Sequence, residues 1–145
     1  MDNFSPAASW LVKVSSDVGS AEVLLREGYI ENSCFHAQQA CEKTLKAYLS
    51  LHEDEPEWTH DLRKLCKTCM RYDAEFEAVL DDASELTQFI SRTRYPGDDS
   101  YSEWDAQEAL EIVRQIYEFT LPRIQALEQA LEEEQGQGDP AMRMQ

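Results

Sequence analysis

A strip of polar side chains in the first third of the chain has the chemistry of an anion site. Four residues at helical steps of three and four form it: His36, Gln39, Lys43 and Lys46. Residues at these steps share one helix face. The two ammonium groups would supply positive charge, and the imidazole and the amide would donate hydrogen bonds. The same pattern is typical of a solvated helix face, and both interpretations stay open.

A second candidate group, Arg92, Arg94 and Tyr95, follows a predicted helix in the segment Thr93-Arg94-Tyr95-Pro96. A guanidinium forms forked hydrogen bonds to phosphate or carboxylate, so these residues could line a ligand pocket or a dimer interface. The alternative is that the arginines bind the chain's own carboxylates. Asp and Glu number 29 against 13 Lys and Arg, which gives a net charge of −16. Such a surface repels nucleic acid, so a nucleotide or RNA site would need a local basic pocket.

The four cysteines are Cys34, Cys41, Cys66 and Cys69. The last two have the C-x-x-C spacing of zinc and redox sites, but both lie at apolar-periodic helical positions and no second such pair occurs. Buried, reduced thiols that pack as small apolar side chains are the better interpretation. Di-iron bundles need a Glu-x-x-His motif on each of two facing helices, and this spacing occurs only once, from Glu57 to His60. We therefore expect no metal and no cofactor.

The elements that must position these residues are all helical. Apolar residues recur at steps of three and four over residues 6–26, 30–51, 59–71, 73–90 and 102–131. Ser5 with Pro6 predicts the first helix start, Gly28 its end, Thr59 a cap for the third helix, and Ser102 with Asp105 a capping box. Pro122 predicts a kink in the last helix. Short connections predict an all-α, up-and-down antiparallel four-helix bundle with an additional short helix.

The length of 145 residues predicts a single domain, residues 1–131, followed by a tail. Residues 132–145 are acidic and then rich in Gln and Gly, so we expect them to be disordered. We see no signal-peptide pattern and no window near the roughly 18 apolar residues that a membrane span needs. A cytoplasmic location is the expectation.

Several short motifs, in this order and spacing, resemble the HEPN domain family over about residues 5–127. They are Asp17, Tyr29, Cys34-Phe35-His36-Ala37-Gln38-Gln39-Ala40, Glu42-Lys43, Leu45-Lys46-Ala47, Thr59-His60-Asp61-Leu62 and Thr93-Arg94-Tyr95-Pro96. The resemblance implies a bundle of four or five helices, commonly a symmetric homodimer, often encoded beside or fused to a small nucleotidyltransferase. Some branches are metal-independent ribonucleases, and others bind nucleotides or a partner without catalysis.

The nuclease branches of the family carry an Arg followed four to six residues later by a His. The His moves a proton to or from the reacting oxygens, and the Arg stabilises the charge that builds on the phosphate. Arg92 and Arg94 occupy the expected region, but no His follows either of them. The only imidazoles are His36, His52 and His60, so the nuclease pair is incomplete.

These observations predict a non-catalytic HEPN-type binding module with a toxin–antitoxin-like or accessory role. It would form a homodimer, with a nucleotide as ligand or a small nucleotidyltransferase as partner. The predicted contacts are Lys43, Lys46, Arg92, Arg94 and Tyr95, with His36 and Gln39 orienting the ligand. Acidic residues between 73 and 85 would meet a basic partner. Two alternatives stay open: a ribonuclease that uses a displaced base, His36 or His60, with Arg94, and a structural dimer subunit without a ligand.

Overall fold

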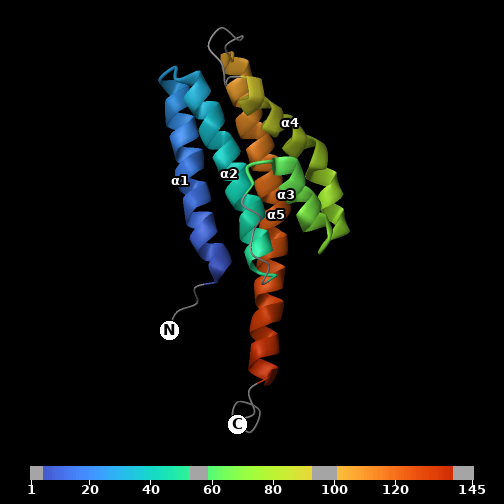
Figure 1. Ribbon diagram of the computed structural model, residues 1–145. Coiled ribbons are helices and arrows are strands. Elements are labelled where there is room, and N and C mark those ends of the chain that lie inside the picture. The colour runs from blue at the N-terminus through green and yellow to red at the C-terminus, as the bar shows by residue number, and fades with distance from the viewer. Residues whose placement is uncertain (1–4, 53–58, 93–100, 139–145) are drawn as a thin grey trace.

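The computed structural model describes residues 5–52, 59–92 and 101–138, apart from the side chains of residues 89–92, 137 and 138. Its elements are α1 (Pro6–Arg26), α2 (Ile30–Ser50), α3 (Leu62–Met70), the 3-10 helix η1 (Ala74–Val79), α4 (Leu80–Arg92) and α5 (Glu103–Gly138). No strand occurs in these three stretches. The predicted all-α, up-and-down bundle with an additional short helix is confirmed (Figure 1).

Helix α2 is the centre of the bundle. It packs against α1, α3, α4 and α5, and more than half of its 21 residues are buried. Figure 1 shows α1 beside it on one side, with α3 and α4 on the other side of the molecule. Phe76 of η1 packs on Tyr48 of α2, with ring centroids 4.7 Å apart, and on Phe119 of α5, at 5.1 Å. Aromatic packing therefore joins the short helix to both long neighbours.

The ends of α1 lie where the sequence predicts them. The Ser5 hydroxyl accepts a hydrogen bond from the Ala8 N–H at 3.2 Å, with Pro6 in the first turn. Gly28 has a φ of +88°, the left-handed conformation that glycine adopts most easily. The Tyr29 N–H donates to the Leu24 carbonyl and the Gly28 N–H to the Leu25 carbonyl, which is a Schellman ending. This ending turns the chain directly into α2.

Two predictions for the middle helices were wrong. Asp61, not Thr59, caps α3, because its carboxylate accepts from the N–H groups of Arg63 and Lys64 at 3.0 and 3.2 Å. The expected single helix over 73–90 is instead η1 followed by α4, and the Asp73 carboxylate caps η1. Apolar residues three or four positions apart share one face in an α-helix and nearly share one in a 3-10 helix. The spacing alone therefore did not distinguish the two kinds of helix.

The last helix begins as predicted and ends later. Ser102 and Asp105 form the expected capping box: the Asp105 carboxylate accepts from the Ser102 N–H at 2.8 Å, and the Ser102 hydroxyl accepts from the Asp105 N–H at 3.2 Å. Helix α5 continues without a break past Pro122, which lies inside it. It continues past Leu131 to Gly138, because residues 132–135 are Glu and Gln, which are good helix formers. The helix end expected near Leu131 was therefore wrong. The disorder expected for residues 132–145 stays a prediction, and residues 139–145 lie outside the described residues.

Candidate functional site

The predicted polar strip of α2 lies against α1, where a buried carboxylate meets it. Asp17 is only 7% exposed. Its Oδ1 atom lies 3.0 Å from His36 Nδ1, and its Oδ2 atom accepts a hydrogen bond from Lys43 Nζ at 2.5 Å. A buried carboxylate needs partners of this kind, since an unpaired charge in the interior costs several kcal/mol. Two of the four strip residues therefore stabilise a charge supplied by α1.

The third strip residue, Lys46, belongs to a second cluster. It is 5% exposed, so it does not lie on a solvated face. Its Nζ atom donates to Glu42 Oε2 at 2.9 Å and lies 5.8 Å from the centre of the Trp10 ring. The other oxygen, Glu42 Oε1, lies 2.9 Å from His60 Nδ1. Glu42 thus bridges a buried ammonium and an imidazole from the segment before α3.

His60 is held from two sides and remains open to solvent. In addition to the Glu42 contact, its backbone carbonyl accepts a hydrogen bond from Gln38 Nε2 at 3.2 Å. Its side chain is 80% exposed. A ring whose Nδ1 faces a carboxylate presents Nε2 on the opposite edge. An oriented, accessible Nε2 can bind a ligand oxygen or exchange a proton.

Of the remaining predicted site residues, only Gln39 has a described side chain, and it takes part in neither cluster. Gln39 is half-buried on α2, and no hydrogen bond of its amide occurs within the described part of the chain. Arg92 is the last residue of α4, and its side chain lies outside what is described. Arg94 and Tyr95 lie outside the described residues altogether. Ligand contact by all seven predicted residues therefore stays a prediction.

Sequence reasoning missed the roles of Gln38 and Glu42. They lie four residues apart, and Lys46 follows after four more, so all three share a face of α2. That face meets the Thr59–Asp61 segment rather than solvent. The spacing of these residues is visible in the sequence. The sequence does not show that the segment with His60 packs against them.

The four thiols are free and buried, as predicted. Burial raises the pKa of Cys34 and that of Cys66 to about 11. Burial also raises the pKa of Cys41 and of Cys69 above the ordinary range. A thiol must ionise to react or to bind metal, so these side chains act as apolar packing at neutral pH. No cluster of three or more metal-ligating side chains occurs among the residues described.

The acidic residues after α3 are partly used within the molecule. The Arg123 guanidinium of α5 donates to Asp73 at 3.1 Å and to Glu75 at 3.2 Å, and its centre lies 3.7 Å from that of the Phe119 ring. These contacts join η1 to α5. The Asp81 and Glu77 side chains stay exposed, so a basic partner would meet them and not Asp73.

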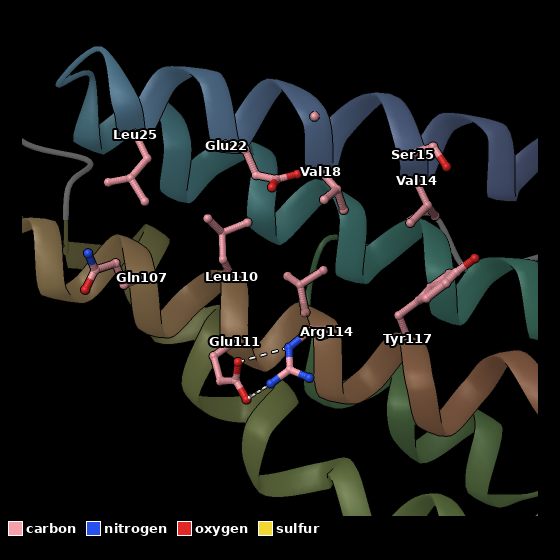
Figure 2. Close-up of a pocket in the computed structure, with 12 residues that line it drawn as sticks. Val14, Ser15, Val18, Glu22, Leu25, Gln107, Leu110, Glu111, Arg114 and Tyr117 are labelled. Atoms are coloured by element: carbon pink, nitrogen blue, oxygen red, sulfur yellow. Dashed lines mark hydrogen bonds and ion pairs between the residues drawn. The ribbon is translucent and has the colours of Figure 1, made fainter.

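An apolar groove, which the sequence analysis did not predict, opens between α1 and α5 (Figure 2). Its volume is about 630 Å³. Val18 and Leu25 from α1 face Leu110 and Tyr117 from α5 across it. Its lining includes none of the four predicted site residues whose side chains are described, His36, Gln39, Lys43 and Lys46. The described residues therefore form two separate candidate surfaces: the α2 clusters and this groove.

The chain is an all-α bundle. Helix α2 lies at its centre, a segment with His60 precedes the short α3, and α5 is the longest helix. The profile of the HEPN domain matches residues 7–125, and the chain belongs to the HEPN domain family. The family resemblance inferred from the motifs is therefore confirmed. None of the helices in the described stretches is both long and apolar enough to cross a membrane.

Two solved structures resemble the chain over most of its length. The crystal structure of ST0689, an archaeal HEPN homologue, is 25% identical with a TM-score of 0.68, and the match covers 83% of this chain and 99% of that one. The crystal structure of TT1696 from Thermus thermophilus is 27% identical with a TM-score of 0.71, covering 82% and 98%. A comparison with curated proteins returned no match.

Proposed function

We propose that this HEPN domain is a non-catalytic binding module that forms a homodimer and binds a nucleotide or a small nucleotidyltransferase. One observation carries the proposal: helix α4 ends at Arg92, and no His follows anywhere in the chain. The nuclease branches of the family need that imidazole to move a proton at the phosphate. An arginine region without it can bind an anion but lacks the family's means of cleaving it.

The α2 clusters support an anion or partner contact next to this region. His60 presents an exposed ring at the start of α3, and the Leu62 N–H donates to Thr87 of α4 at 3.0 Å. Thr87 lies five residues before Arg92, which is about 7.5 Å along a helix. The segment that carries His60 therefore contacts α4 about one and a half turns before Arg92, which supports an anion site shared by the imidazole and the end of α4.

Exposed aromatic side chains support self-association. Tyr29, Phe35 and Trp104 are 59%, 48% and 65% exposed. They come from the α1–α2 connection, the first turns of α2 and the first turn of α5, which lie at the same end of the bundle (Figure 1). Aromatic residues are enriched at the buried centres of interfaces. A homodimer would cover this end of the molecule.

The test is calorimetric titration with ATP and other nucleotides, together with co-purification of a small nucleotidyltransferase. Lys43→Gln and Arg94→Gln should each weaken nucleotide binding about tenfold, the effect of about 1.4 kcal/mol. Lys67→Gln is the matched control, because it removes the same charge from the exposed face of α3. Equal weakening by all three variants, or binding of neither a nucleotide nor the enzyme, would contradict the proposal.

A second candidate, a metal-independent ribonuclease, is favoured by the His60–Glu42 contact alone. In that reaction His60 Nε2 would take the proton of a ribose 2′-hydroxyl, the freed oxygen would bond to phosphorus, and the bond from phosphorus to the 5′ oxygen would break with protonation of that oxygen by solvent. RNA cleavage in the presence of a chelator decides between the candidates. Cleavage that disappears in both His60→Ala and Arg94→Ala would establish the enzyme and reject the binding module.

A further inference from the structure

The groove between α1 and α5 has a mainly apolar floor with polar residues beside it. Its apolar lining comes from both helices: Val14, Val18, Leu25, Leu110, Val113 and Tyr117. Val14 and Val113 are buried, whereas Val18 and Leu110 remain partly exposed. In Figure 2 the side chains of the two helices point toward each other across an open channel. Apolar surface of this kind, bounded by polar residues, is typical of a docking site.

Among the residues that the structure describes, no side chain fills the groove. Gly19 and Ser15, both small, are the α1 residues at its edge. A Cβ atom placed on Gly19 would meet no heavy atom within 4 Å. At the N-terminal end of α1, the Ser5 hydroxyl donates to the Glu128 carboxylate of α5, so the two helices are joined there and not along the groove.

The dimensions of the groove fit a helix. From Val14 to Leu25 the groove follows α1 for about 16 Å, at 1.5 Å per residue. This corresponds to about three turns of an added helix. An amphipathic helix that places its apolar face in such a groove is one of the recurring forms of peptide recognition.

The charges at the edge indicate which helix fits. Glu22 lies on the α1 side and Glu111 on the α5 side. The one cation in the lining, Arg114, donates to Glu111 and, at 3.2 Å, to Glu118, so its charge is already matched. Carboxylates therefore exceed cations at the edge. A second copy of the chain would bring the same carboxylates and a further net charge of −16, whereas a basic helix would be attracted.

We infer that the groove between α1 and α5 is the docking site for a basic amphipathic helix of another protein. The apolar stripe of that helix would lie on Val18, Leu110 and Tyr117, and its Lys or Arg residues would meet the exposed Glu22 at the edge. The inference deepens the proposed function, on which it rests, by naming a surface for the protein partner. It involves none of the residues proposed to contact a nucleotide.

The experiment uses a dye-labelled peptide of about 18 residues, with Leu at one helical face and Lys elsewhere, and measures its binding to the full chain by fluorescence anisotropy. Two control peptides have the same Leu positions with Glu in place of Lys, and the same composition in scrambled order. The decisive variant is Gly19→Trp, which puts a ring into the groove. Gly19→Ala is the matched control, because it leaves the groove open, and Glu22→Lys reverses an exposed edge charge.

We expect saturable binding of the Leu/Lys peptide that Gly19→Trp weakens about 30-fold or more, the loss of one hot spot, while Gly19→Ala leaves it unchanged. Glu22→Lys should weaken the Lys peptide and strengthen the Glu peptide. Equal affinity in Gly19→Trp, or for the scrambled peptide, would overturn the inference. The inference would also be overturned if the wild type sediments as a homodimer and Gly19→Trp as a monomer, because the groove would then be the dimer interface.

Nucleotide titration of the same Gly19→Trp protein separates this inference from the proposed function. Unchanged nucleotide binding together with lost peptide binding supports the groove as a distinct protein-docking surface. Peptide binding that persists in Gly19→Trp rejects the groove as the docking site. The proposed nucleotide site is then still tested separately, by Lys43→Gln and Arg94→Gln.

Discussion

The Oε1 atom of Glu42 lies 2.9 Å from Nδ1 of His60, which fixes the segment before α3 to the middle of α2. Glu42 itself is 4% exposed, and its second oxygen accepts from the buried Lys46. One carboxylate therefore has both a structural task, to match a buried ammonium, and a positional task, to orient an exposed imidazole. These two tasks can be separated by mutation.

Glu42→Gln should lower the free energy of unfolding by about 3–5 kcal/mol, because it leaves the buried Lys46 charge without its partner. Urea unfolding followed by circular dichroism measures the loss. Glu118→Gln is the control: it removes an equally charged group from an exposed ion pair with Arg114 and should change stability by less than about 1 kcal/mol. Similar losses of unfolding free energy in the two variants would show that the buried Glu42–Lys46 pair contributes no more than the exposed Glu118–Arg114 pair.

The double variant Glu42→Met/Lys46→Met should recover much of that stability, because apolar side chains of similar size can replace a buried ion pair at little cost. If it is as unstable as Glu42→Gln, the loss comes from the freed His60 segment instead of the unpaired ammonium. Hydrogen exchange of the amides at the start of α3 would then be faster in both variants.

The buried thiols predict a loss of stability in alkali. The pKa of Cys34 and that of Cys66 are about 11 in the folded chain, above the value of about 8.5 for an unfolded thiol. Between these values the unfolded state has released the proton and the folded state has not, so the stabilisation that is complete below about pH 8.5 is lost as the pH rises toward 11. Each thiol contributes a slope of up to about 1.4 kcal/mol per pH unit. Urea midpoints measured from pH 7 to 10 should fall more steeply in the wild type than in Cys66→Ala.

Two glycines in the same hairpin should respond in opposite directions to alanine. Gly19 lies inside α1 with open space around it, so Gly19→Ala should raise stability by about 0.5–1 kcal/mol. Gly28 has a φ of +88°, where a Cβ is strained, so Gly28→Ala should lower stability by about 1 kcal/mol. Melting temperatures of the two single variants test this. A higher melting temperature in Gly28→Ala would mean that the Gly28 turn is not in the left-handed conformation, and a lower one in Gly19→Ala would contradict the prediction for α1.

Asp61→Ala should cost about 1 kcal/mol, since the Asp61 carboxylate caps two N–H groups of α3. Thr59→Ala removes only the acceptor for the Asp61 N–H and should cost less. Chemical denaturation of both variants compares them. A larger loss in Thr59→Ala would return the cap to the position that the sequence pattern first indicated.

Three local features were predictable from the sequence, and the contacts between helices were not. Ser5, Gly28 and the Ser102–Asp105 pair act through side chains or backbone within a few residues, so their types reveal their roles. The contact of Asp17 with Lys43 spans 26 residues. Helical spacing shows which residues share a face, but it does not show which carboxylate lies opposite that face. The polar strip was therefore visible before the fold was known, whereas its internal pairing was not.

The groove was out of reach of sequence reasoning for a different reason. Gly19 and Ser15, which have no side chain or a small one, line it. A small residue indicates a gap only once the neighbouring helices are known. The candidate arginine region remains a prediction, because Arg94 and Tyr95 lie outside the residues that the structure describes.

Helix α5 has a mechanical consequence for anything joined to it. The last of its fully buried side chains belongs to Ile124, yet the helix continues to Gly138 and extends beyond the other helices (Figure 1). Leu127 and Leu131 still pack against the core, so the free part is residues 132–138, a rod of about 10 Å at 1.5 Å per residue. A fluorophore or a fused domain placed after the rod would keep a set offset from the bundle, unlike one on a Gly/Ser tether, whose end-to-end distance fluctuates.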